Sequence, residues 1–236
     1  MKEYTSIDEV IGRLNTLQSK YVILRNYENL TKPELFLNGH ADIDILCEDS
    51  QEIVGILDAD TNRIDKPPFK GDGTHYYIYI NKEKVSLDLR FVGDGYYCDK
   101  WQRDMLNLRE REGAFYVLNK ENYFYSLIYH AILQKQVLTK EYQDRLSSMA
   151  TALDIEVTCP SESVFISLLQ SYMRKKGYRF VYPKDYTVPC RFNLIDKRMI
   201  DSDYRLQFIH WRFEAKVAII ALLVKIKHIV WGIGKH

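Results

Sequence analysis

The sequence has few cysteines, and they are far apart. Cys47, Cys98, Cys159 and Cys190 are the four in 236 residues, and no two of them form a C-x-x-C pair. This spacing argues against a zinc site or a redox motif. A chain of this length can bury an adequate core without disulfides, so we interpret the four thiols as reduced, as expected in a cytoplasmic protein.

The sequence also lacks a strong net charge and a secretion signal. Its formal net charge is +1, which gives no general attraction to nucleic acid, so we expect no nucleic-acid partner. The first residues, MKEYTSIDEVIGRL, contain no apolar signal core, which argues against secretion. Internal repeats and low-complexity segments are missing as well. The composition is that of an ordinary globular protein, and the length of 236 residues is enough for one large domain or two small ones.

Hydrophobic patterns predict a mixture of strands and helices in the first half of the chain. A capping box of Ser6 and Glu9 begins a helical pattern over residues 6–18. Further helices are predicted around 51–57 and over 101–111. Apolar runs predict strands at 20–25, 41–47, 75–80, 84–92 and 114–119, and the third and fourth of these read as an antiparallel hairpin.

From residue 120 onward the pattern is mostly helical. Helices are predicted over 121–135, 139–153 and 161–176, followed by an irregular stretch over 177–203. We therefore predict an α+β fold with a small mixed or antiparallel sheet and flanking helices over residues 1–119. A helical domain with a basic, apolar C-terminal end is predicted over residues 120–236.

Three aspartates lie within the predicted strands. Asp42 and Asp44 share one face of ADIDILC, since residues two apart in a strand point the same way, and Asp88 lies in KVSLDLRFV. If the strands are neighbours, the three like charges repel unless a cation lies between them, and Mg²⁺ prefers such oxygen ligands. From Asp42 and Asp44 alone, a half-exposed solvated strand is an equally good interpretation. Asp88 favours a site, because aspartate is disfavoured in strands.

The segments VILRNYENL, GHADIDIL and VSLDLRFVGDGYYC, followed by Trp101, resemble the nucleotidyltransferase superfamily. They are similar in particular to nucleotidyltransferase-like proteins of bacterial surface-polysaccharide clusters, over residues 20 to 135. The resemblance implies that Asp42, Asp44 and Asp88 are catalytic and bind Mg²⁺ or Mn²⁺. It also implies that Asp88 lies near the attacking hydroxyl of the acceptor.

The chain departs from the superfamily pattern after the first strand. Where the superfamily usually has Gly-Ser, this chain has Arg25 and Asn26, and its Gly39-His40 pair comes just ahead of Asp42. We predict that these four residues bind phosphate, with Arg25 making a bidentate charge-assisted contact in place of backbone N–H groups. This substitution favours a phospho-substrate other than a plain nucleoside triphosphate. The alternative for Arg25 is an ordinary surface arginine.

Three further basic residues are candidates for phosphate binding. Arg90 shares a face with Asp88, so it either contacts a phosphate or pairs with an aspartate. The resemblance implies that the helix over 121–135 packs on the nucleotide, which would bring His130 and Lys135 to it. The alternatives are a helix-surface or core histidine and a favourable lysine charge at a helix C-terminus.

The C-terminal part of the chain is basic and ends in an apolar segment. From Arg174 onward there are 14 Lys and Arg against 5 Asp and Glu. The uncharged run Val217–Val224 is too short to span a bilayer, and Lys225 and Lys227 lie about 160° apart on a helix. We expect a buried final helix with a basic tail. The alternative is peripheral contact with an anionic membrane, which would place the protein at its inner face.

Together these features predict a metal-dependent transferase. It would move a nucleotidyl group from a nucleotide or nucleotide-activated donor onto a glycan or another hydroxyl acceptor, and the resemblance implies a role in surface-glycan modification. Polysaccharide-cluster relatives and the phosphocholine-transferase family imply a second option, the transfer of a phospho-head-group. The alternative from another class is a non-catalytic module that binds a nucleotide or partner, including the toxin–antitoxin type.

Overall fold

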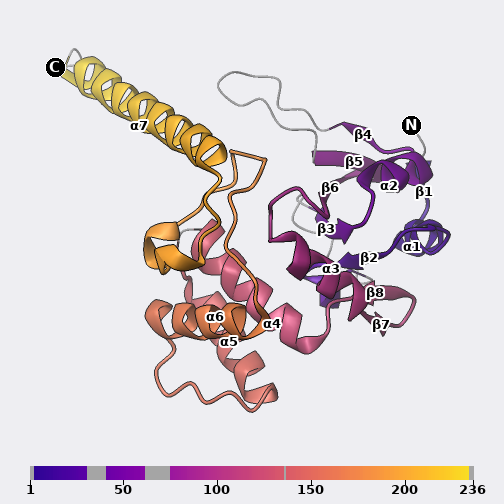
Figure 1. The fold of residues 1–236 in the computed structure, drawn as a ribbon. Coiled ribbons are helices and arrows are strands. Elements are labelled where there is room, and N and C mark those ends of the chain that lie inside the picture. Colours follow the sequence, from indigo (N-terminus) through magenta and orange to yellow (C-terminus); the bar gives the residue numbers. More distant parts are fainter. Residues whose placement is uncertain (1–2, 31–40, 62–74, 136, 234–236) are drawn as a thin grey trace.

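A computed structural model describes residues 3–30, 41–61, 75–135 and 137–233, with the side chains of 29, 41 and 227–233 outside the description. The strands gather on one side of the molecule, and the helices from α4 onward lie on the other (Figure 1). The last helix points away from both groups. The turn-rich stretch around Pro67 and Gly71 lies outside the described residues.

The described strands form one mixed sheet in the order β1-β5-β6-β3-β2-β8-β7, with β4 paired to β5. Neighbours alternate between parallel pairs (β1 with β5, β6 with β3, β2 with β8) and antiparallel pairs. The α+β prediction with a mixed sheet is therefore confirmed. The strands are β1 Glu3–Tyr4, β2 Tyr21–Ile23, β3 Ala41–Cys47, β4 Asp60–Thr61, β5 His75–Ile80, β6 Glu83–Phe91, β7 Glu110–Glu112 and β8 Phe115–Val117.

The predicted hairpin is formed by β5 and β6. Its two-residue turn consists of Asn81 and Lys82, which have φ angles of 50° and 67°. Positive φ at both positions suits the tight turns that match the twist of paired strands. The turn fixes the register, and this register sets His75 directly opposite Asp88.

Three helices belong to the first half, namely α1 Ile7–Leu14, α2 Ser50–Leu57 and α3 Asp99–Asn107. The Ser6 hydroxyl caps α1 by accepting a hydrogen bond from the Glu9 amide at 3.3 Å. The Glu9 carboxylate accepts one from the Thr5 amide at 3.1 Å. The predicted capping box is thus present with its return contact moved back by one residue.

The second half begins with α4 Lys120–Ile128, which continues as a π-helical segment, Tyr129–Gln134. Helices α5 Lys140–Ala152 and α6 Glu162–Lys176 follow. The predicted irregular stretch contains two short 3-10 turns, Phe192–Leu194 and Lys197–Met199. Helix α7 Tyr204–Ile233 ends the described chain. The helical C-terminal half is therefore confirmed.

The sheet separates two hydrophobic cores because alternate residues of each strand face opposite sides. Ile43 and Ile45 of β3 belong to the core that includes buried residues of α1 and α2. Leu46, on the other face, belongs to the core that includes α3, α4 and α6. Polar side chains on that second face of β3 and β6 therefore point toward the helical half of the chain.

The second core is organised around Trp101 of α3. The fully buried indole donates a hydrogen bond to the Asn122 side-chain oxygen at 2.8 Å. The hydroxyl of Tyr172 donates to the same oxygen at 3.0 Å. One buried amide of α4 thus ties α3 to α6, which fixes how the helical half packs on the sheet.

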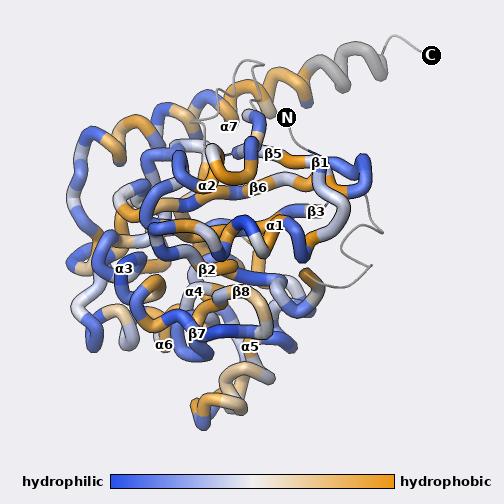
Figure 2. Tube along the Cα trace, turned by 90° about the vertical axis from the view of Figure 1, so that its right-hand side faces the viewer, coloured by the Kyte–Doolittle hydropathy of each residue, from blue (hydrophilic) through white to orange (hydrophobic). Residues whose placement is uncertain are grey.

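The prediction of a buried final helix is wrong. Beyond Lys216, the large apolar side chains of α7 are 37% to 59% exposed as far as Ile226. Figure 2 shows this helix running along one side of the molecule, with hydrophobic and hydrophilic stretches. Among the helices of the described residues, none has the length and apolar character needed to cross a membrane.

Candidate active site

A cleft of about 290 Å³ lies where the sheet faces the helical half of the chain. Its walls come from β3, β5 and β6, from the residues after β2, from the π-helical segment and from the stretch between α6 and α7. Residues from both halves of the chain therefore meet in one cavity.

The three predicted carboxylates all line this cleft. Asp44 and Asp88 are direct partners in the parallel pair β3–β6. Asp42 lies two residues before Asp44, on the same face and exposed, while Asp44 is buried. Adjacent strands are about 4.8 Å apart, so the arrangement concentrates negative charge on one small area of the sheet.

Two cations from the protein pair with these carboxylates. The Arg25 guanidinium, just after β2, donates a 2.5 Å hydrogen bond to Asp44 and also reaches the Tyr96 hydroxyl at 3.4 Å. His75 contacts Asp88 through Nδ1, and the hairpin register sets the two residues opposite each other. The surface-arginine interpretation of Arg25 is wrong, because its side chain is buried in the cleft wall.

The environment shifts the pKa values of these groups. Burial raises the pKa of Asp44, and the charge of Arg25 opposes that rise. Burial also acts to raise the pKa of Asp88, but the hydrogen bond with His75 and nearby positive charges outweigh it, and the pKa is lowered. The contact with Asp88 raises the pKa of His75. A protonated His75 and an ionised Asp88 therefore stabilise each other.

Arg90 connects the sheet to the C-terminal part of the chain. Its guanidinium lies 3.5 Å from the Asp185 carboxylate and 3.9 Å from Asp88, so its pairing with aspartate is the arrangement observed. It also covers the ring of Tyr96 at 4.3 Å from the centroid. The buried Asp185 lies 3.9 Å from His75 Nε2, so His75 stands between two carboxylates.

His130 and Lys135 also line the cleft. His130 is buried, and its Nδ1 lies 3.1 Å from the Gln134 side-chain oxygen and 3.4 Å from the Tyr96 hydroxyl. Burial, and then the charge of Arg25, holds the pKa of His130 well below its usual value, so the imidazole is neutral at neutral pH. The π-helical segment, which closes with Lys135 N–H donating to His130 C=O at 2.9 Å, places these side chains.

Asn26 is the last of the predicted residues found in the cleft. It has a φ of 58°, a left-handed conformation that asparagine tolerates, and its side-chain oxygen accepts a hydrogen bond from Arg145 at 3.0 Å. Gly39 and His40 lie outside the described residues. The structure thus brings together every described member of the predicted set.

Sequence reasoning missed several residues of the cleft. His75 was within reach, because a two-residue turn at Asn81 and Lys82 pairs position 80 with 83 and hence 75 with 88. No turn or strand pattern in the sequence indicated that Asp185 and Thr187 would reach the cleft. They lie in an irregular stretch between α6 and α7, without a strand or helix periodicity to place them.

A divalent cation is implied by the resemblance, and the donor chemistry of the cleft fits one. Asp42, Asp44 and Asp88 offer carboxylate oxygens on one face of the sheet, which are the ligands that Mg²⁺ and Mn²⁺ prefer. Within the described residues, however, no three acidic, histidine or cysteine side chains already converge as a metal site. Two of the three carboxylates are held by Arg25 and His75 instead. A cation in this cleft would have to compete with those contacts.

The fold and the cleft define an α+β protein whose acidic, cation-paired cavity lies between a mixed sheet and a helical half. No protein-family model and no curated protein matches the chain. A solved structure of the antibiotic-resistance factor ANT(2'')-Ia is similar to it, with a TM-score of 0.38 and 11% sequence identity. That likeness covers 72% of this chain and 90% of the other. The reaction is therefore proposed from the residues of the cleft.

Proposed function

We propose that the cleft is the active site of a divalent-metal-dependent transferase of the nucleotidyltransferase type. The observation that carries the proposal is the direct pairing of Asp44 with Asp88 in neighbouring parallel strands, with Asp42 on the same face. Carboxylates from two adjacent strands suit a cation that must also contact a substrate phosphate. The resemblance of the sequence supports the same assignment.

Asp42, Asp44 and Asp88 would hold Mg²⁺ or Mn²⁺. When bound, such an ion supplies neutralisation of phosphoryl charge and orientation of the reacting groups. Arg25 and Asp44 form an ion pair in this structure. A divalent cation that bound Asp44 would replace Arg25 as its partner, so the guanidinium would be available to a phosphate oxygen. The Arg25 guanidinium would thus pair with Asp44 before a substrate binds and with a substrate phosphate afterwards.

The donor would be a nucleotide or a nucleotide-activated head group. Arg90 and Lys135 line the cleft and would balance the remaining phosphate charge. The acceptor hydroxyl oxygen would attack the phosphorus as the bond to pyrophosphate or to the leaving nucleotide breaks. Asp88 would orient the hydroxyl, whose proton is released to water. Positioning and electrostatics would provide most of the catalysis. The resemblance to polysaccharide-cluster proteins supports a glycan hydroxyl as the acceptor.

The test compares the wild-type protein with Asp42→Asn. Asp42 is exposed, so this change leaves the buried pair of Arg25 and Asp44 in place. The control is Asp144→Asn, which removes an exposed carboxylate from α5. With Mg²⁺, nucleoside triphosphates and CDP- or CMP-linked head groups are screened for released pyrophosphate or nucleotide and for thermal stabilisation.

We expect metal-dependent turnover with the wild type and the control. Asp42→Asn should lose about 100-fold or more of the rate, as expected when one group that stabilises phosphoryl charge is removed. Turnover that is equal in Asp42→Asn and the wild type would refute the metal-site assignment. Product release that continues at full rate in the presence of a chelator would do the same.

One observation favours a second candidate, a non-catalytic module that binds a nucleotide or a partner. Arg25 and His75 already neutralise Asp44 and Asp88 without any added ion. Such a module would be stabilised by a nucleotide to the same extent with and without Mg²⁺. It would show identical shifts of the melting temperature in the wild type and Asp42→Asn, with no product.

A further inference from the structure

Helix α7 carries a continuous line of exposed apolar side chains, which we call the outward stripe. Its members follow one another at spacings of three and four residues, so at 100° per residue they fall within an arc of about 80°. Apart from Ala215, their side chains are 46% to 78% exposed. The members are Tyr204, Phe208, Trp211, Ala215, Ile219, Leu222 and Ile226.

The opposite side of the helix fixes it to the rest of the protein. His210 is buried, and its Nε2 lies 2.7 Å from the Pro183 carbonyl oxygen. The Phe213 ring packs 5.2 Å from that of Tyr186. On a helical wheel, His210 and Phe213 lie about 140° and 160° from the middle of the outward stripe, so the middle of the stripe points away from these contacts.

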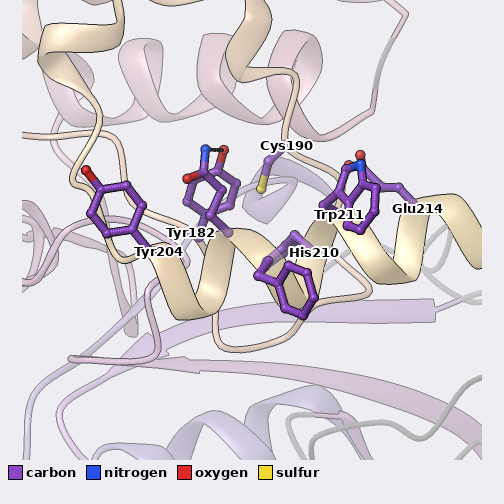
Figure 3. A pocket seen from close by; sticks show the side chains of 8 residues that line it. Tyr182, Cys190, Tyr204, His210, Trp211 and Glu214 are labelled. Atoms are coloured by element: carbon purple, nitrogen blue, oxygen red, sulfur yellow. Dashed lines mark hydrogen bonds between the residues drawn. The ribbon is translucent and has the colours of Figure 1, made fainter.

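A cavity of about 440 Å³ borders the base of the stripe (Figure 3). Tyr204 and Trp211 line it together with Cys190, and Gln207 donates a 3.4 Å hydrogen bond to the Tyr182 hydroxyl. Tyr204 and Trp211 remain 78% and 61% exposed in spite of these neighbours. The first turns of α7 therefore contact the body on one side, while Tyr204 and Trp211 stay exposed to solvent on the other.

Basic residues border the outward stripe on both sides. Arg205, Arg212 and Lys216 are exposed and lie within about 40° of one another along one flank. Lys225 is exposed on the other flank. Glu214 is the one acidic residue between positions 204 and 226, against these four cations.

We propose that the outward stripe docks on the surface of a lipid bilayer that contains acidic headgroups, with the axis of α7 in the plane of the interface. Apolar side chains would enter the boundary of headgroups and acyl chains, while the flanking cations would reach lipid phosphates.

The charge pattern distinguishes a membrane from a second copy of this chain. Two identical stripes packed together would bring four cations of each copy against those of the other, with one glutamate on each side to offset them. An acidic lipid surface complements the same charges. The proposal does not depend on the reaction in the cleft.

The anchored base of α7 connects this surface to the cleft. Pro183 and Tyr186 hold the helix, and Asp185 and Thr187, from the same stretch, line the cleft wall. A helix lying on a membrane would therefore be attached directly to the stretch that forms this wall.

The experiment measures sedimentation of the full chain with vesicles, either of equimolar phosphatidylcholine and phosphatidylglycerol or of phosphatidylcholine alone. We expect binding to the acidic vesicles that weakens with salt, together with a blue shift of tryptophan fluorescence. Ile219→Gln/Leu222→Gln should reduce partitioning about tenfold or more, since it removes two exposed apolar side chains from the stripe. Leu108→Gln, which alters an exposed leucine at the end of α3, should have no effect.

A second variant tests the charge. Arg212→Gln/Lys216→Gln should weaken binding to acidic vesicles about tenfold and leave phosphatidylcholine unaffected. The proposal is overturned if the wild type sediments with neither kind of vesicle, or if the stripe variant sediments as well as the wild type. It is also overturned if light scattering shows a dimer that Ile219→Gln/Leu222→Gln converts to a monomer.

Discussion

Replacement of Arg25 by methionine tests the electrostatics of the cleft most directly. The Arg25 and Asp44 side chains are 9% and 5% exposed and lie 2.5 Å apart. Arg25→Met replaces the aliphatic stem of arginine with an unbranched apolar side chain of similar length. The Asp44 carboxylate then stays buried without its cation. Loss of one partner of a buried ion pair costs about 3–5 kcal/mol in the free energy of unfolding. For a chain of this size, we expect the melting temperature to fall by about 6–20 °C.

The pH dependence of this loss follows from the pKa of Asp44. Burial already raises that pKa, and removal of Arg25 takes away the charge that opposes the rise. A carboxyl whose folded pKa lies above its unfolded value of about 3.9 takes up a proton on folding. The free energy of unfolding of Arg25→Met should therefore decrease as the pH rises from about 4 toward the raised pKa, more steeply than in the wild type.

Urea denaturation at a series of pH values measures both effects. Asp44→Asn combined with Arg25→Met should recover part of the stability, because a neutral amide tolerates burial better than an unpaired carboxylate. The control is Arg198→Met, which removes an 89% exposed guanidinium paired with Asp196 and should leave stability unchanged. A loss below about 1 kcal/mol for Arg25→Met, or strict additivity in the double variant, would refute the reasoning.

Two further predictions concern stability. Gly95→Ala should destabilise the protein by about 2 kcal/mol or more, because Gly95 has a φ of 75° and an added Cβ would lie 2.7 Å from the Tyr182 carbonyl oxygen. Thermal unfolding checks it, and an unchanged melting temperature would contradict it. Asn122→Leu should cost about 3 kcal/mol, because it removes the acceptor shared by the Trp101 and Tyr172 donors. Chemical denaturation followed by tryptophan fluorescence measures this loss, and a change of a few tenths of a kcal/mol would contradict it.

Local chemistry in the sequence was sufficient to predict most elements of the fold. The alternation of ADIDILC predicted β3 with its observed bounds, and the turn after Ile80 predicted the β5–β6 hairpin. The short strands β1, β4 and β7 were missed, and the predicted helix over 101–111 was wrong at its end, because α3 stops at Asn107 and β7 begins at Glu110. These strands contain two or three residues each, too few for a period of two to be recognised. The division of the chain at residue 119 stays a prediction.

The cleft could be predicted only in part, for a physical reason. Asp42, Asp44 and Asp88 could be assigned to one face because strand geometry is periodic and the two strands are neighbours. Asp185 faces the same cleft through tertiary packing of an irregular stretch, which no local pattern encodes. The final helix was predicted to be buried because most of its residues are apolar. Which of those residues are exposed depends on the side of the helix that contacts the body, and composition does not determine that side.

The cleft is assembled from residues that leave the ribosome at very different times. Asp44 and Asp88 emerge early, and Asp185, which faces His75 and Arg90, emerges about a hundred positions later. A nascent chain released up to α6 would hold the sheet carboxylates without this wall. Since domains form from the N-terminus during translation, the cavity becomes complete only after the stretch between α6 and α7 has been synthesised.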